Sequence, residues 1–381
     1  MTDSRIAAVE LIPLELPLTR PFAPSWTPGR VRRTHALLLA RLTVDAGAQG
    51  IGATVGFSGG RLAAGLEQEC VDRFVGLDLF DEAGWAAHLQ GLAMFGMPRP
   101  WFLDIARWDL IGKLSDQPVY RLLGGVTDVV EAYVSTGELR PAPQRVEDVL
   151  RFVEAGFRAV KLRFHEPDPN TDFEVFDAVV DAVGDRVQVA VDANQGWALY
   201  PRPHSWDVRS ATAIAERLAD AGTLWLEEPL DRHNLAGLAE LRRRSRVPIA
   251  GGEMNVAPDD LRRLIQGRCL DILQPDAVFA GGITGVRQIL DEARAAGLRY
   301  TPHAWSNGVG LLANLHLAAA AGGRELFEYP WEPGCWEPEH RDFVLTEPIT
   351  TDAQGRLRLP KQPGLGIELD EERMDAYRID R

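Results

Sequence analysis

Eight short apolar runs, each followed by a segment of helix length or by the tail, occupy residues 130–330. They read EAYVSTG, RAVKLRF, VQVAVDAN, LWLEEP, PIAGGE, LDILQPD, YTPHAW and ELFEYP. Polar residues at the ends of seven runs are spaced by 23 to 35 residues, which suits one βα unit each: Arg163, Asp192, Glu227, Glu253, Asp276, His303 and Glu328. Parallel strands buried on both faces can close into a barrel with its active site at the strand C-termini. We predict an α/β fold, a (β/α)-barrel over residues 128–331.

The chain of 381 residues exceeds the roughly 250 that one barrel needs, so a second domain is expected. Before the barrel, alternating apolar residues predict an antiparallel meander, and helical spacing then predicts three helices. The strands are Ile6–Leu16, His35–Val44 and Gln49–Val55, and the helices Leu66–Phe74, Ala83–Leu92 and Phe102–Leu114. We predict an N-terminal α+β capping domain over residues 1–127, and a loop-rich segment, residues 332–381, that returns to it.

The charge balance is acidic, with 41 basic against 55 acidic residues and a net charge of -14. This argues against a nucleic-acid or anionic-membrane partner. Neither a signal peptide nor an apolar run approaching ~20 residues is present, which favours a cytoplasmic protein. Cys70, Cys269 and Cys335 are scattered and odd in number, so we expect buried free thiols. A homo-oligomer is expected only as the common case.

Three carboxylates, Asp192, Glu227 and Glu253, end successive predicted strands and would converge on one side of the barrel mouth. Each alone is more readily interpreted as a helix N-cap or a solvated loop residue. Three at consecutive strand ends require a cation between them. Ligands that are all oxygen favour Mg²⁺, so we predict one Mg²⁺ per subunit.

Two further groups of residues suit proton transfer. Lys161, Arg163 and His165 alternate on one strand and share a face. Beside another cation and a metal, Lys161 would have a lowered pKa and could act as a base, whereas His165 can equally be a loop histidine. Asp276 and His303 end neighbouring strands, where the carboxylate would orient the imidazole, although a buried structural histidine is the common alternative.

The final predicted strand ends in Glu328, which could donate a hydrogen bond to a substrate carboxylate if protonated or could form an ion pair.

These motifs together resemble the enolase superfamily and, within it, the mandelate racemase group. The segment ARWDLIGKLSDQPVYRLLGG resembles the one that joins the family's two domains, and VDANQGW, WLEEPL and GGEMN resemble its three metal-ligand segments. QPD and TPHAW resemble its Asp/His dyad, and FEYP the segment that carries an electrophilic Glu. The resemblance implies Mg²⁺ on Asp192, Glu227 and Glu253, with Glu228 beside them. It also implies a Lys or His base, with Mg²⁺ stabilising an ene-diolate, as is general for enolase-type sites.

One position departs from this pattern, because Arg163 stands where most of the group has the second lysine of Lys-x-Lys. Arginine stays protonated and is better suited to binding a carboxylate or hydroxyl than to removing a proton. The base therefore stays open between Lys161, Arg163 and His303.

The resemblance also implies two specificity loops, near residues 22–33 and 55–61. They carry Ser25, Trp26 and Ser58, which we expect at the substrate together with Asn194 and His165. The polar loops favour a sugar acid over an aryl substrate.

We therefore predict an enzyme, a Mg²⁺-dependent lyase that abstracts the proton alpha to a carboxylate and dehydrates an aldonate or aldarate. The alternatives are a racemase, epimerase or cycloisomerase of a carboxylate or lactone and, more distantly, a non-catalytic ligand-binding barrel.

Overall fold

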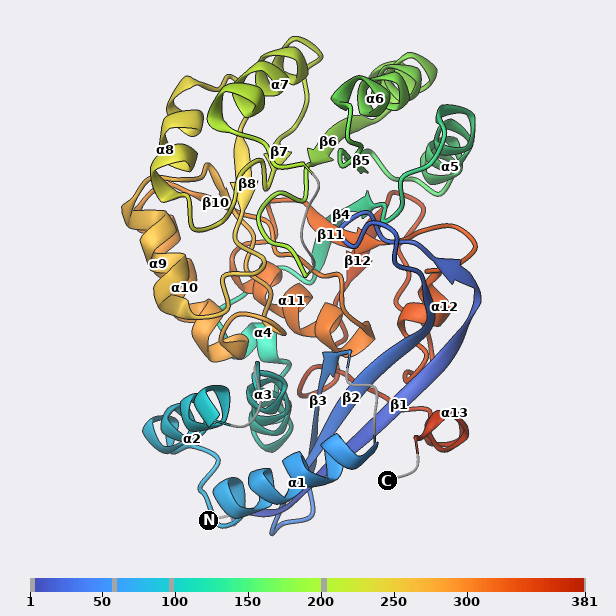
Figure 1. Ribbon diagram of the computed structural model, residues 1–381. Coiled ribbons are helices and arrows are strands. Elements are labelled where there is room, and N and C mark those ends of the chain that lie inside the picture. The colour runs from blue at the N-terminus through green and yellow to red at the C-terminus, as the bar shows by residue number, and fades with distance from the viewer. Residues whose placement is uncertain (1–3, 57–59, 96–98, 200–203, 380–381) are drawn as a thin grey trace.

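The computed structural model describes residues 4–56, 60–95, 99–199 and 204–379. Its N-terminal part is an antiparallel sheet with strand order β1-β2-β3, flanked by helices (Figure 1). The strands are β1 (Ile6–Phe22), β2 (Arg32–Val44) and β3 (Gln49–Val55), and the helices α1 (Gly60–Phe74), α2 (Glu82–Phe95), α3 (Phe102–Leu114) and the short α4 (Val119–Leu122). The predicted meander and helices are confirmed, with β1 and α1 longer than predicted.

The second part is a curled sheet of eight parallel strands with helices on its outside, as predicted for a (β/α)-barrel (Figure 1). The hydrogen-bonded order is β10-β9-β8-β7-β6-β5-β4-β11. The strands are β4 (Val129–Ser135), β5 (Ala159–Arg163), β6 (Gln188–Asp192), β7 (Leu226–Glu227), β8 (Ile249–Gly251), β9 (Ile272–Leu273), β10 (Arg299–Tyr300) and β11 (Phe327–Pro330). The helices between them are α5 (Ala142–Glu154), α6 (Pro169–Val183), α7 (Val208–Asp220), α8 (Leu235–Arg244), α9 (Pro258–Gln266), α10 (Gly282–Ala295) and α11 (Gly308–Ala320), with a 3₁₀ turn at Gly184–Arg186.

Side-chain alternation along the strands separates the interior of the barrel into layers. On each strand, side chains that face the barrel interior alternate with side chains that pack against the helices. Some of the interior side chains form a small buried apolar cluster, in which the rings of Tyr133 and Trp225 meet edge to face with their centroids 5.1 Å apart. Ala159, Ala190 and Trp225 belong to this cluster, and two residues further along each strand lie Lys161, Asp192 and Glu227. Because side chains repeat on one face with a period of two, the apolar layer forms the floor beneath the polar layer.

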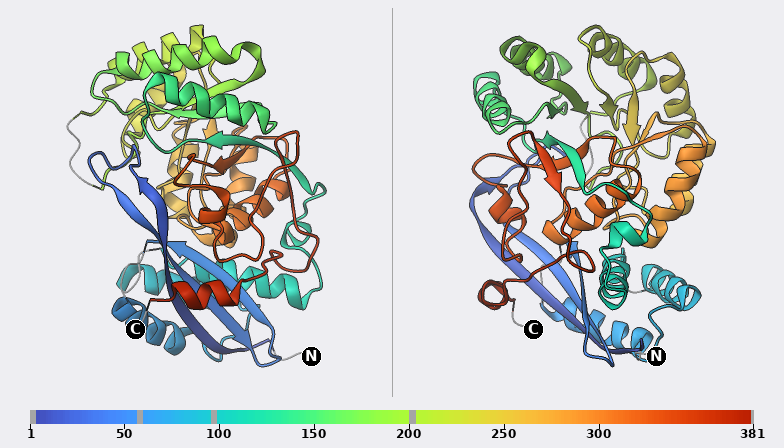
Figure 2. Two further views of the ribbon diagram at one scale, coloured as in Figure 1. Left: turned by 90° about the vertical axis from the view of Figure 1, so that its right-hand side faces the viewer. Right: turned by 180° about the vertical axis from the view of Figure 1, so that it is seen from behind.

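The C-terminal segment contacts both parts of the molecule. It holds α12 (Pro338–Arg341), β12 (Arg356–Arg358) and α13 (Glu371–Tyr377). Strand β12 pairs antiparallel with β4, and Arg378, just after α13, bridges Leu14 of β1. Figure 2 shows α13 beside the N-terminal sheet.

Two further expectations from the sequence concern the cysteines and membrane-spanning segments. The three cysteines are buried and unpaired, as predicted. No described helix combines the length and the apolar character needed to cross a membrane.

Candidate active site

The three predicted metal ligands come together at the C-terminal ends of β6, β7 and β8. Asp192, Glu227 and Glu253 are buried, and each offers one carboxylate oxygen within 4.8 Å of the others. Burial, and then the charge of Glu227, raises the pKa of Asp192 to about 7, and burial also raises that of Glu253. Buried carboxylates that repel one another would be stabilised by a cation, and their oxygens are the donors that Mg²⁺ prefers. The residues therefore fit a divalent ion.

Neutral donors orient two of these carboxylates. Glu227 Oε2 accepts from Trp225 Nε1 at 3.0 Å and from Gln274 Nε2 at 2.8 Å. Glu253 Oε1 accepts from Trp197 Nε1 at 2.7 Å. Each glutamate thus keeps its second oxygen on the inner side of the site, and such donors fix the direction of a ligand oxygen. The sequence interpretation missed all three donors, although Trp225 lies two residues before Glu227 on the same strand face.

Backbone strain occurs beside two of the ligands. Asn194 and Glu228 have φ angles of +47° and +46°, in the left-handed region that residues other than glycine rarely adopt. Asn194 thereby donates its backbone N–H to Asp192 Oδ1 at 2.8 Å and its side-chain amide to Oδ2 at 3.0 Å. Glu228 is buried with Oε2 unpaired, and a Cβ at Gly196 would lie 2.1 Å from its Oε1. Burial, and then the charges of Glu253 and Asp192, raise the pKa of Glu228.

The cations of β5 face the triad, as predicted from their alternation. Lys161 Nζ lies 2.7 Å from Glu227 Oε1, 2.7 Å from Glu328 Oε1 and 3.8 Å from Asp192 Oδ2. Burial lowers the pKa of Lys161, but the carboxylates of Glu227 and Glu328 outweigh burial and raise it. A metal ion bound to the same carboxylates would act in the opposite direction.

Glu328 is found in the ion-pair form. Burial raises its pKa, but Lys161 and then His303 reverse this and bring the pKa to about 2. Its other oxygen, Oε2, accepts from the backbone N–H of Ala304 at 2.6 Å. The carboxylate of the last barrel strand therefore holds Lys161 from the side opposite Glu227.

Arg163 is fixed on several sides. It forms an ion pair with Asp192, donates Nη2 to Ser135 Oγ at 3.1 Å, and donates Nε to the carbonyl of Thr136. Its Cζ lies 5.0 Å from the ring centroid of Trp26 and 5.7 Å from that of Trp305. The guanidinium beside these two indoles is held by cation–π attraction as well as by hydrogen bonds.

The predicted dyad of Asp276 and His303 is present. His303 Nδ1 lies 2.8 Å from Asp276 Oδ2, and Nε2 lies 3.3 Å from Glu253 Oε2. Burial lowers the pKa of His303, but Glu253, Glu328 and Asp276 raise it to about 10; a cation bound to Glu253 would act in the opposite direction and favour the neutral imidazole that can accept a proton. Asp276 Oδ1 accepts from Asn314 Nδ2 and from the backbone N–H of Val278, both at 2.8 Å. The carboxylate is thus fixed, and the Nε2 atom points at the metal-ligand side.

The predicted substrate-binding residues come from the capping part and from the barrel. Ser25 and Trp26, in the loop between β1 and β2, reach the barrel. Ser25 Oγ donates to Asn194 Oδ1 at 3.0 Å, and the backbone N–H of Ser25 donates to the carbonyl of Gly137 at 2.9 Å. His165 is half-buried and bonds through Nδ1 to the carbonyl of Ala193 at 3.0 Å, one residue from Asp192. Ser58 lies outside the described residues.

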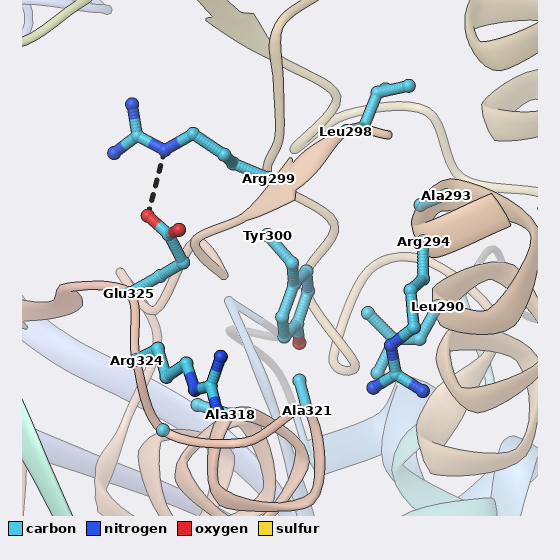
Figure 3. Close-up of a pocket in the computed structure, with 11 residues that line it drawn as sticks. Leu290, Ala293, Arg294, Leu298, Arg299, Tyr300, Ala318, Ala321, Arg324 and Glu325 are labelled. Carbon is cyan, nitrogen blue, oxygen red and sulfur yellow. Dashed lines mark hydrogen bonds and ion pairs between the residues drawn. The ribbon is translucent and has the colours of Figure 1, made fainter. Parts of the chain in front are cut away.

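A separate cavity of about 190 Å³ lies at the other end of the barrel, where β10 begins (Figure 3). It is lined by the ends of α10 and α11 and by residues around Tyr300, with Arg299 paired to Glu325 at 2.8 Å. None of the predicted site residues lines it. In barrel enzymes chemistry takes place at the strand C-termini, so the polar layer and not this cavity is the candidate active site.

The chain resembles known protein families over the part that carries these site residues. Residues 144–373 match the family model described as Enolase C-terminal domain-like. Arabinonate dehydratase of Saccharolobus solfataricus is 30% identical over 76% of this chain and 74% of its own length. L-talarate/galactarate dehydratase of Salmonella typhimurium is 30% identical over 97% of this chain and 90% of its own length. Other relatives include cycloisomerases and an L-Ala-D/L-Glu epimerase.

A solved structure resembles this chain over nearly its whole length. L-talarate dehydratase from Polaromonas sp. JS666, crystallised with Mg and L-glucarate, superposes with a TM-score of 0.84. The two chains are 29% identical, and the match covers 99% of this chain and 98% of that one.

Proposed function

The chain belongs to the enolase superfamily, and we propose that it is a Mg²⁺-dependent dehydratase that acts on a sugar acid, an aldonate or aldarate. The observation that carries the proposal is the order of residues around the barrel. Lys161 on β5 precedes the three carboxylates of β6 to β8, and the Asp276–His303 dyad follows them. A substrate carboxylate at the triad would have its alpha carbon between these two groups.

Asp192, Glu227 and Glu253 would hold the ion. When bound, Mg²⁺ would supply the positive charge that stabilises an ene-diolate. Lys161, 2.7 Å from Glu227 Oε1, lies where its ammonium group can donate to a substrate carboxylate oxygen. Arg163 holds Asp192 in place and stays protonated, because its pKa, lowered by burial, is raised further by Asp192.

Proton transfer on one face is assigned to His303. Asp276 fixes Nδ1, so Nε2 is the atom that can exchange a proton with substrate. Dehydration removes the proton from C2 and the hydroxyl from C3 as one water, and the resulting enol tautomerises to a 2-keto-3-deoxy acid. His303 can serve as base at C2 or as the acid that assists hydroxide departure, and Lys161 serves the opposite face.

Substrate hydroxyls are assigned to the residues between cap and barrel. Asn194 and Ser25 share a hydrogen bond and present amide and hydroxyl groups beside Asp192. Trp26 packs on Arg163, and His165 is hydrogen-bonded through Nδ1 to the carbonyl of Ala193. Ser58 stays a prediction from sequence for the second specificity loop.

The second candidate function is a racemase, epimerase or cycloisomerase. Lys161 favours it, because its amine lies on the side of the triad away from His303 and could give two-sided proton transfer. Cycloisomerases and an epimerase are also among the relatives.

The test is an NMR screen of the Mg²⁺-loaded enzyme in D₂O against aldonic and aldaric acids. We expect a product that has lost one water and carries deuterium at C3. Deuterium at C2 with every hydroxyl retained would identify an epimerase instead. No conversion of any acid would contradict both acid-based proposals and direct the screen to lactones.

We further propose a location in the cytoplasm, a homo-oligomer and no nucleic-acid partner, in line with the acidic charge of -14. Domain boundaries near residues 127 and 331 belong to the same proposal. Size-exclusion chromatography with light scattering would measure the oligomeric state.

A further inference from the structure

Arg99 is a residue of the capping part that reaches the dyad side of the barrel mouth. It lies three residues before α3 with a φ of +68°, a conformation that arginine adopts only under constraint. Its guanidinium carbon lies 5.0 Å from the ring centroid of Phe279, and that ring lies 5.7 Å from the His303 imidazole. Phe279 follows Asp276 by three residues, so Arg99 is stacked on the turn that leaves the catalytic end of β9.

The electrostatic surroundings place the same group near the site. Burial lowers the pKa of Arg99, Asp276 and Glu253 act to raise it, and Arg232 lowers it further. Arg232, which is also half-buried, thus adds to the positive charge that acts on Arg99. Arg232 follows β7 and donates its backbone N–H to the carbonyl of Gly196 at 3.0 Å, beside Glu228.

No carboxylate of the described residues neutralises Arg99 directly. The oxygens of Asp276 are bonded to His303, Asn314 and Val278, and those of Glu253 face Trp197 and His303. Stacking on Phe279 offsets only part of the cost of burying a charge without an anionic partner. An anion supplied by a ligand would complete the pairing.

We propose that Arg99, with Arg232 beside it, binds the second carboxylate of the substrate, so that the enzyme acts on aldarates in preference to aldonates. The inference rests on the proposed dehydratase function. Phe279 contacts both His303 and Arg99, so Arg99 lies on the His303 side of the metal ligands, where it could meet the far end of a six-carbon acid whose first carboxylate is bound at those ligands. An aldonate would place a neutral CH₂OH group there and leave the two guanidinium groups unneutralised.

The experiment compares acids that differ only at C6, galactarate with galactonate and glucarate with gluconate, in the Mg²⁺-loaded enzyme. For the acid pair that is dehydrated, we expect kcat/KM to favour the diacid by about 10- to 100-fold, the range of one charge-assisted hydrogen bond. Arg99→Gln should remove this preference by raising KM for the diacid, with less than about a threefold change for the monoacid. Arg99→Lys should retain part of the preference, because it keeps the positive charge but loses the guanidinium group that can donate two parallel hydrogen bonds to a carboxylate.

Arg268→Gln is the matched control, since Arg268 is also an arginine in the left-handed region, with φ +51°, but is exposed after α9. It should leave both acids unaffected. If wild type dehydrates the monoacid as efficiently as the diacid, or if Arg99→Gln lowers both equally, the inference fails while the dehydratase stands. If wild type dehydrates neither kind of acid, the proposed function fails and the inference with it.

Discussion

Replacing Asp276 by asparagine tests the proton-transfer assignment most directly. Asp276 Oδ1 accepts two hydrogen bonds, from Asn314 Nδ2 and Val278 N, and Oδ2 faces His303 Nδ1 at 2.8 Å. An asparagine at this position must keep its amide oxygen toward the two donors, because an amide NH₂ group there would place hydrogen-bond donor against donor. Its NH₂ group then faces Nδ1, which forces Nδ1 to accept and moves the ring proton of neutral His303 to Nε2.

With Nε2 carrying the proton, neutral His303 can no longer accept one from the substrate. General acid–base catalysis contributes about 10²- to 10⁴-fold, so kcat should fall by that factor, equivalent to about 3 to 5 kcal/mol. The assay is the rate of dehydration at saturating Mg²⁺, together with the rate of deuterium incorporation from D₂O. Both rates should fall together, because one nitrogen serves both.

The matched control is Asp271→Asn at the opposite end of the same strand. Asp271 pairs with Arg242 at 2.8 Å and accepts from Ile249 N at 2.9 Å, away from the active site. It should lower stability slightly and leave kcat unchanged. If Asp276→Asn kept kcat within about threefold of wild type with Mg²⁺ bound, the assignment of His303 would be wrong.

Three further predictions concern the metal site and the fold. Glu253→Gln should weaken Mg²⁺ binding by more than about 100-fold in titration calorimetry; unchanged affinity would remove Glu253 from the ligand set. Burial lowers the pKa of His316 to about 4, below the ordinary 6.5, so the unfolded chain takes up this proton first and stability falls between pH 6.5 and 4. His316→Asn should reduce that loss by about 3 kcal/mol in urea unfolding at the two pH values; an unchanged pH dependence would count against it. Gly196→Ala should lower the free energy of unfolding by about 1–3 kcal/mol, because its Cβ would lie 2.1 Å from Glu228 Oε1. Gly65→Ala, where a Cβ meets open space, is the control and should not destabilise; equal effects would show that this contact relaxes freely.

The barrel and its ligand triad could be predicted from sequence because both depend on local repetition. Each buried strand is a short apolar run, and each ligand stands at the end of one, so spacing alone placed Asp192, Glu227 and Glu253 on one side. The length of β1 could not be predicted in the same way. Pro17 and Pro21 interrupt the alternating pattern and usually end a strand, but β1 is an edge strand of its sheet and tolerates them.

Contacts between segments far apart in sequence could not be predicted. Burial lowers the pKa of Lys161, whereas Glu227 and Glu328 raise it, and Glu328 comes from the last barrel strand to lie 2.7 Å away. Arg99 belongs to a loop without periodicity, and only the folded chain brings it over Phe279. Trp197 and Gln274 are a partial exception: each lies near a predicted site residue, and Gln274 shares the alternation of Asp276 on β9 and the turn after it.

The substitution of arginine for a second lysine on β5 has a consequence for the reaction. A lysine at position 163 could lose a proton, but Arg163 has Asp192, Ser135 and Thr136 as hydrogen-bond partners and two indoles beside its plane. Arginine does not deprotonate in proteins, so this position can fix a ligand carboxylate and cannot act as a base. Within β5, Lys161 remains able to exchange a proton, and it is held between Glu227 and Glu328. We therefore expect His303 to carry the proton transfer at substrate carbon, which suits a dehydration better than a reaction that needs an equivalent base on each face.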